Sequence, residues 1–259
     1  MHIICIFIES LWLLAKQTLN IMKKALLLTS WALSVSLPAA SLLTGGHMDG
    51  PAFGYVSVAD VTDDPSLTQG FEPHFHNEGG ADGAVINGNA VTTESEYDPS
   101  DLVIVVPQTS TITVASTNYY WLPETEQDAT DKGAPFLGLG LEELVETDWE
   151  DGLLTISLNS INGPGNFRLW QDDGLGGVNI FLDSNDPSKS SFELLAGLHT
   201  HYNWGFTALG AYQLEFGISG THVVDGLQSG SGTYTFLVPE PSTALLGALA
   251  SIGLLRRRR

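Results

Sequence analysis

Residues 210–218 read Gly-Ala-Tyr-Gln-Leu-Glu-Phe-Gly-Ile, and this stretch decides the fold class. Its large apolar side chains fall at every second position, at Tyr212, Leu214, Phe216 and Ile218. Successive side chains of a β-strand point to opposite faces, so a period of two is typical of a strand with one buried face. A helix would instead repeat its apolar residues every three or four positions. The stretch therefore predicts a strand over residues 211–218.

The same period recurs along most of the chain. Short stretches rich in Val, Ile, Thr, Tyr and Phe alternate with turn-forming residues, which is typical of many short strands. Further strands are expected over residues 53–58, 102–106, 111–115, 153–158 and 233–238. The turn-forming sequences between such strands are Asn87-Gly88, Asn162-Gly163-Pro164-Gly165, Asp173-Gly174 and Asp225-Gly226.

Helical patterns are scarce between the two ends of the chain. Residues 139–146 predict one short helix, whereas residues 60–80 and 124–132 read as looser acidic loops. Many short strands with regular turns favour an all-β fold. The sequence therefore predicts an antiparallel β-sandwich, Ig-like or jelly-roll-like, with a short helical insertion.

The first forty residues have the pattern of a secretory signal. Met22-Lys23-Lys24 supplies positive charge, residues 25–37 supply an apolar run, and Pro38-Ala39-Ala40 supplies small residues for signal peptidase. We therefore expect residues 1–40 to be a signal peptide, helical in its apolar run. Met22 is the alternative start of translation.

The last residues have the pattern of a sorting tail. Pro239-Glu240-Pro241 precedes an apolar run over residues 242–255, which is shorter than the roughly 20 residues of a membrane-spanning helix. Four basic residues that favour the cytoplasmic side then end the chain: Arg256, Arg257, Arg258 and Arg259. Residues 239–259 resemble the PEP-CTERM sorting domain. The resemblance implies an apolar helix processed by an exosortase-type enzyme; a plain transmembrane anchor is the alternative.

Residues 41–238 remain between these ends, enough for one domain with its own core. Three of the ten Lys and Arg residues fall there, against 28 of the 30 Asp and Glu residues, so its formal net charge is −25, compared with −20 for the whole chain. Such a charge repels phosphate backbones and argues against nucleic acid as a partner. The single cysteine, Cys5, lies outside this range, so the domain has no disulfide and no cysteine-ligated metal.

Closely spaced histidines are the main chemical signal. His74-Phe75-His76 and His199-Thr200-His201 are His-x-His pairs, and His47 stands two residues before Asp49. On a strand, residues i and i+2 face the same side, so each pair can reach one ion at about 2.0–2.1 Å. Nitrogen and oxygen donors without cysteine suit zinc. The predicted metal ligands are His47, His74, His76, His199 and His201, with Asp49, Glu72 and Glu78 as further ligands, outer partners or solvated groups.

Two alternatives to a zinc site stay open. The histidines can be ordinary strand residues that bind no ion. Calcium is the competing ion, because residues 60–64 and 183–186 are oxygen-rich. Neither stretch has the spacing of a twelve-residue calcium loop, so structural turns are expected there.

The run His199-Thr200-His201-Tyr202-Asn203-Trp204-Gly205-Phe206-Thr207, followed by Gly210-Ala211-Tyr212, resembles the surface-anchored domain of actinobacterial wall and choice-of-anchor M proteins. Gly46-His47-Met48-Asp49 and Gly163-Pro164-Gly165-Asn166-Phe167 extend the resemblance. That family is found beside metal-type ABC transporters. Together with the tail, the chain resembles PEP-CTERM proteins repressed by a zinc regulator (Zur). Trp204 and Phe206 are expected to be core residues.

These patterns favour a non-enzymatic, exported protein of the cell envelope or surface that binds zinc and takes part in zinc scavenging. A metal ABC transporter is the partner that the resemblance implies, and contact with the membrane is expected only through the terminal segments. The alternative is an exopolysaccharide- or partner-binding matrix module with a structural metal site. A metallohydrolase is disfavoured, because no His-Glu-x-x-His, Gly-x-Ser-x-Gly or phosphate-binding loop is present.

Overall fold

The computed structural model describes residues 40–240, in which strands form three sheets and helices are few. The predicted signal peptide, except for Ala40, lies outside the described residues. Residues 241–259 of the predicted sorting tail, which include Pro241 and the four arginines, also lie outside the described residues. Within the described residues, no helix is both long and apolar enough to span a membrane.

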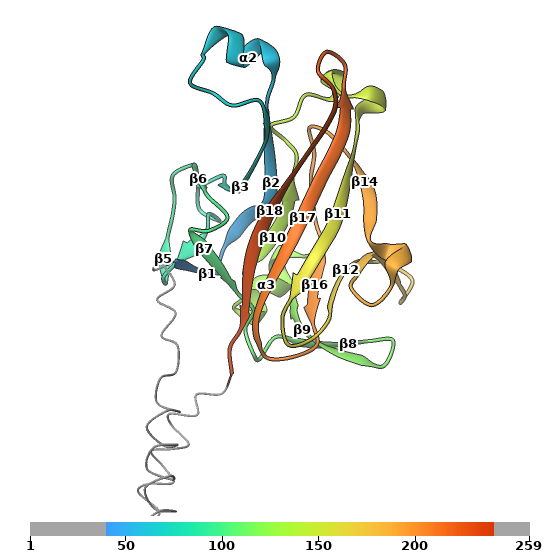
Figure 1. Cartoon of the computed structure of the whole chain (residues 1–259). Coiled ribbons are helices and arrows are strands. Elements are labelled where there is room, and N and C mark those ends of the chain that lie inside the picture. The colour runs from blue at the N-terminus through green and yellow to red at the C-terminus, as the bar shows by residue number, and fades with distance from the viewer. Residues whose placement is uncertain (1–39, 241–259) are drawn as a thin grey trace, which may run out of the picture. The chain divides into compact units, whose positions relative to one another are not determined.

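The largest sheet, here the long sheet, has eight strands. Its order is β14 (Ser191–Leu195), β11 (Leu153–Asn162), β17 (Gly210–His222), β18 (Gly226–Val238), β7 (Leu102–Val105), β1 (Ser41–Gly45), β4 (Val85–Ile86) and β5 (Asn89–Ala90). Its three longest strands, β11, β17 and β18, run side by side (Figure 1). The period-two stretch over residues 211–218 lies inside β17, as predicted.

Two five-stranded sheets complete the architecture. The second sheet has the order β15 (His199–His201), β10 (Phe136–Gly140), β2 (His47–Val56), β3 (Gly70–Asn77) and β6 (Ser95–Tyr97). The third sheet has the order β13 (Val178–Asp183), β12 (Phe167–Asp172), β16 (Asn203–Phe206), β9 (Thr117–Leu122) and β8 (Thr111–Val114).

Aromatic side chains pack the long sheet against both smaller sheets. Phe75 of the second sheet contacts Tyr234 of β18, with ring centroids 5.0 Å apart. Trp204 of the third sheet stacks on Phe236 of β18 at 5.7 Å. All four side chains are fully buried, and Phe206 is buried beside them, which confirms the core role predicted for Trp204 and Phe206. The described chain is therefore an all-β sandwich.

Most of the predicted strands and turns are confirmed. Residues 153–158 and 233–238 lie inside β11 and β18, and residues 102–106 and 111–115 match β7 and β8 to within one residue. Of the strand predicted over residues 53–58, residues 53–56 form the end of β2, whereas Ser57 caps α2 and Val58 begins it. Each predicted turn sequence joins two consecutive strands of the structure.

The predicted helix over residues 139–146 is wrong. Its first two residues complete β10, and its last residue begins the 3-10 turn η1 (Glu146–Asp148). A second 3-10 turn, η2 (Glu150–Gly152), follows. The helices lie instead at α2 (Val58–Asp63), α3 (Glu126–Lys132) and η3 (Pro187–Lys189). Thr125 caps the start of α3, and Gly133 ends it in the left-handed conformation, so local capping makes a helix of a stretch expected to be a loop.

The expectation of a purely antiparallel sandwich needs a correction. Three strand pairs are parallel: β1 with β7, β7 with β18, and β2 with β10. Parallel neighbours require a long connection, and some eighty residues separate β2 from β10 along the chain. The alternating pattern within a strand does not report the direction of its neighbour.

The inter-sheet aromatic contacts predict a matched pair of stability effects on β18. Phe236→Ala removes a fully buried ring and is expected to lower the free energy of unfolding by about 3–5 kcal/mol. Leu227→Ala, on the same strand but 78% exposed, is expected to change it by less than about 0.5 kcal/mol. Urea unfolding followed by circular dichroism measures both. Equal effects for the two variants would contradict this packing.

Candidate metal centre

The second sheet brings the predicted metal residues into one row across its strands. His201 on β15 is in register with Gly138 on β10, and Gly138 is in register with Asp49 on β2. Asp49 is in turn in register with His76 on β3. Residues side by side in a sheet point to the same face. Phe75 points into the core toward Tyr234, so its neighbour His76, and with it the row, points to the outer face.

A glycine in the middle of this row lets the donors meet. The side chain that any other residue would carry at position 138 would overlap Asp49 Oδ1 and lie 3.1 Å from His201 Cε1. The Asp49 carboxylate therefore lies over Gly138, beside the His201 ring. A side-chain carbon at position 140 would likewise lie only 3.2 Å from Asp49 Cβ and 3.2 Å from Glu142 Oε2. The two glycines of β10 thus form the floor of the site.

Seven side chains, here called the donor cluster, gather over this floor: His47, Asp49, His76, Glu78, Glu142, His199 and His201. One nitrogen from each of His47, His199 and His201 lies within 4.8 Å of the others. Nitrogens bound to one zinc ion lie about 3.4 Å apart, so small side-chain rotations would bring these three onto one ion.

Carboxylates surround the three imidazoles. Asp49 Oδ1 lies 3.5 Å from His47 Nε2, and Glu142 Oε2 lies 3.5 Å from His199 Nδ1. Glu142 Oε1 lies 3.5 Å from His76 Nδ1 on the other side. Glu78, half exposed, approaches His47 Nδ1 at 3.7 Å. One atom each of Asp49, Glu78, Glu142 and His199 forms a second group within 4.8 Å.

The polar atoms of the cluster are buried without hydrogen-bond partners. Among residues 40–240, nine buried side-chain nitrogen and oxygen atoms lack a partner, and seven of them belong to this cluster. They are His47 Nε2, both oxygens of Asp49, His76 Nδ1, both oxygens of Glu142, and His201 Nδ1. A buried polar atom without a partner costs about 1–3 kcal/mol, and more when it is charged. Cations bound in the cluster would give these atoms partners.

Burial and mutual charge shift the proton affinities of the cluster. Burial, aided by the positive charge of His47, lowers the pKa of His201 to about 4, so that this imidazole is neutral at neutral pH. Burial also opposes the charged form of His47, but Asp49, Glu78 and Glu142 outweigh it and raise the pKa of His47. Burial and the charge of Asp49 raise the pKa of Glu142. The Asp49 pKa is lowered, because the neighbouring imidazoles outweigh its burial.

Local structure holds these donors in place. Phe136 stacks on His201, with ring centroids 3.7 Å apart and planes 9° from parallel. Gly46 adopts a left-handed φ of +70°, and a side chain there would overlap the backbone of Gly83. The fully buried Asn77 donates to Thr93 O at 2.8 Å and accepts from Ala84 N at 2.8 Å. Asn77 thereby fixes the loop that carries Glu78.

Two predicted residues lie apart from the cluster. Both ring nitrogens of His74 already have partners, Glu72 O at 3.0 Å and Glu143 Oε1 at 2.9 Å. The Glu72 side chain itself is exposed. Glu142 is the cluster residue that the sequence did not predict. Its signal was the alternation Gly138-Leu139-Gly140-Leu141-Glu142, which has the period of a strand and places Glu142 on the same face as the two glycines.

The acidic stretches considered for calcium are explained by local structure. Ser57 caps α2, the Asp60 carboxylate accepts from Ser57 N at 2.8 Å, and Asp64 accepts from Ser66 N at 2.9 Å. Asp183 accepts from Arg168 Nε at 2.8 Å, and Asp186 caps η3 through Ser188 N at 3.0 Å. These carboxylates thus have local partners in turns, in helix caps and, for Asp183, in an ion pair with Arg168.

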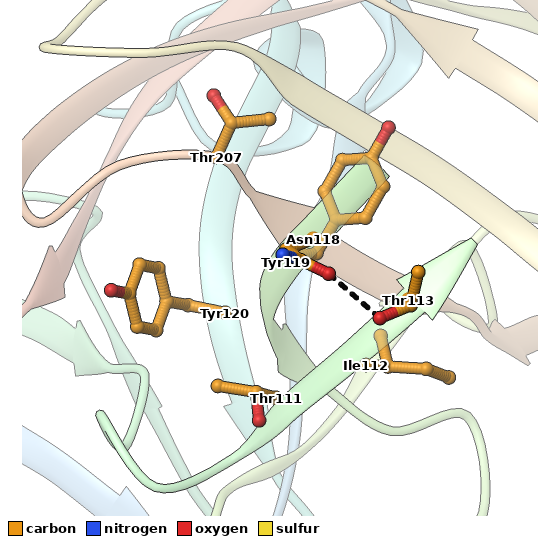
Figure 2. Close-up of a pocket in the computed structure, with 7 residues that line it drawn as sticks. All are labelled: Thr111, Ile112, Thr113, Asn118, Tyr119, Tyr120 and Thr207. Carbon is orange, nitrogen blue, oxygen red and sulfur yellow. Dashed lines mark hydrogen bonds between the residues drawn. The ribbon is translucent and has the colours of Figure 1, made fainter. Parts of the chain in front are cut away.

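A separate hollow of about 440 Å³ lies on the third sheet, away from the strands that carry the donor cluster. Figure 2 shows its lining, which contains no histidine or carboxylate: Thr111, Ile112, Thr113, Asn118, Tyr119, Tyr120 and Thr207. Thr113 Oγ1 donates to Asn118 Oδ1 at 2.7 Å. A smaller hollow of about 310 Å³ adjoins the donor cluster through His47 and Phe136.

Comparison with known proteins identifies no relative of this chain. No protein-family model, no curated protein and no solved structure matches this chain.

The protonation of His201 gives a direct test of this geometry. In metal-free protein, its imidazole resonances are expected to stay those of the neutral form from pH 7.5 to pH 5, because burial and His47 lower its pKa to about 4. In urea the same residue should titrate near 6.5. Imidazole NMR spectra of the folded and unfolded chain provide the comparison. A midpoint near 6.5 in the folded protein would place His201 in water rather than in the cluster.

Proposed function

We propose that this protein binds zinc through His47, His199 and His201, with a carboxylate oxygen of Asp49 as the fourth ligand. The observation that supports it best is the set of seven buried polar atoms without partners that converge on one place. Three neutral imidazoles and one carboxylate are a donor set that zinc accepts in tetrahedral geometry.

The electrostatics also favour a cation. The domain has a net charge of −25, and Asp49, Glu78 and Glu142 concentrate negative charge at the cluster. His201 is neutral at neutral pH, so a metal ion displaces no proton from it. The stacked Phe136 ring keeps it oriented. The absence of cysteine from the domain leaves nitrogen and oxygen donors only, which suits zinc better than softer copper(I).

The biological role proposed is non-enzymatic zinc capture at the cell surface. The signal pattern and the PEP-CTERM-like tail imply export, and the resemblance to Zur-repressed surface proteins implies production when zinc is scarce. A metal ABC transporter is the proposed acceptor. Glu142 faces His199 and His76 at 3.5 Å each within the cluster, so it is assigned to ion binding rather than to catalysis.

The second candidate is an exopolysaccharide-binding module in which the metal is structural. The hollow in Figure 2 favours it, because three threonine hydroxyls, an amide and two tyrosines suit a neutral polyol. Retention on polysaccharide that survives a chelator and is lost in Tyr120→Ala would favour this role. The absence of such retention would favour the leading role.

Zinc affinity should depend on the β15 histidines. Changing His199 and His201 together to Ala removes two of three nitrogen ligands, and zinc affinity is expected to fall at least a hundredfold. His222→Gln is the matched control, because His222 lies at the end of β17 and bonds Asp225 N instead. Isothermal titration with zinc measures all three proteins. Unchanged affinity in the double variant would overturn the assignment.

Zinc affinity should also fall with pH. Protons compete with zinc for the imidazoles, and the carboxylates raise the pKa of His47 above its ordinary value. Between pH 7.5 and 5.5 the affinity is expected to drop at least about tenfold, since a histidine of pKa 6.5 or higher is then mostly protonated. Equal affinity at both values would mean that His47 is not a ligand.

The floor of the site offers a steric test. Gly138→Ala places a methyl group on the Asp49 carboxylate and beside His201, so zinc affinity is expected to fall at least tenfold with the fold retained. Gly45→Ala on β1 is the matched control, because its added carbon meets only Val85 at ordinary contact distances of 3.7 and 3.8 Å. Circular dichroism checks the fold, and zinc titration gives the affinity. A Gly138 variant that binds like the control would contradict the proposed centre.

A further inference from the structure

The donor cluster holds more ligands than one ion can use. A structural zinc ion takes four protein ligands. The cluster offers seven side chains, of which four are histidines and three are carboxylates. Assigning four to one ion leaves His76, Glu78 and Glu142, with three of the seven unpartnered buried atoms among them.

The spacing of the strands also means that one ion cannot reach both ends of the donor cluster. His201 and His76 lie three strands apart, which corresponds to roughly 14 Å between their Cα atoms. Two nitrogens on one zinc ion lie only about 3.4 Å apart. An ion on the His201 side therefore leaves His76 free, and His76 Nδ1 faces Glu142 Oε1 at 3.5 Å instead.

Asp49 lies between the two halves. Its side chain is fully buried, and neither of its oxygens has a hydrogen-bond partner among the described residues. One oxygen faces His47 at 3.5 Å, and one carboxylate oxygen also lies within 4.8 Å of donor atoms of Glu78, Glu142 and His199. A carboxylate with two free oxygens can bind a different ion through each.

We propose that the centre holds two divalent cations bridged by Asp49, an inference that rests on the zinc site proposed above. The first ion binds the three imidazoles of His47, His199 and His201. The second binds Glu142 and His76, with Glu78 closing it on the solvent side. The second position is richer in oxygen, so it accepts zinc and also harder ions such as manganese(II).

The experiment is the metal stoichiometry of the full chain. Protein stripped with a chelator is loaded with zinc, desalted and analysed for bound zinc per chain by mass spectrometry. The parent is expected to hold two ions. Glu142→Gln keeps the size of the side chain but removes its charge, and is expected to hold one. His201→Ala is expected to hold one as well, since the second position remains.

Glu143→Gln is the matched control, because Glu143 neighbours Glu142 in sequence but bonds His74 instead of entering the cluster. It is expected to keep both ions. Cobalt(II) spectra of the parent and of Glu142→Gln give a second readout, because one of two sets of bands should vanish in the variant. Circular dichroism shows whether each variant is folded.

The outcomes separate the two proposals. One ion in the parent, unchanged in Glu142→Gln, would overturn the second position and leave the zinc site standing. No bound ion in the parent would overturn both. Two ions in the parent that persist in Glu142→Gln would place the second ion elsewhere and would also overturn the inference.

Discussion

The buried carboxylate of Asp49 is the constraint on which the centre depends. Removing an ionised carboxylate from water costs several kcal/mol unless charge or hydrogen bonds replace the lost hydration. Here no described residue donates to either oxygen, and only the surrounding imidazoles offset the cost. The chain still places this carboxylate over a glycine floor in the middle of a sheet. Packing against a glycine floor does not replace the lost hydration of the two oxygens, whereas the cation proposed above would.

The same strand order that buries Asp49 brings its partners together. β2 and β10 are parallel and β10 and β15 antiparallel, so segments near residues 49, 138 and 201 become neighbours. The chain then leaves β15 and enters β16 in the third sheet, where Trp204 is clamped in the core. The Trp204 indole donates to Leu137 O at 3.2 Å, directly before Gly138. In the His-x-His-x-Asn-Trp run, two histidines of the donor cluster are thus followed directly by the tryptophan that fixes their strand to β10.

Much of this could be predicted from the sequence because strand periodicity is local. The alternation in residues 211–218 and the pairs at His74 and His199 report which side chains share a face, and the structure confirms the strands. Which strands become neighbours depends on long-range pairing, so nothing local placed His74 beside Glu143 rather than in the cluster. Glu142 was missed because residues 139–146, with three leucines and three glutamates, were predicted to form a helix, although Gly140 weakens a helix. The ends of α3 could also have been predicted, because Thr125 is a typical N-cap residue and Gly133 a typical residue at the C-terminal end of a helix.

The two candidate roles use different sheets and are therefore separable. The donor cluster lies on the outer face of the second sheet, whereas the hydroxyl-lined hollow belongs mainly to β8 and β9 of the third. No cluster residue lines that hollow, so within the described residues a ligand there would neither contact the ion nor require it. The two sheets meet through the Trp204 to Leu137 hydrogen bond and a shared core. Metal binding can stabilise that junction, but a chemical link between ion and polyol would need contacts that this arrangement does not provide. Zinc dependence of any polysaccharide binding would therefore report on folding, not on coordination.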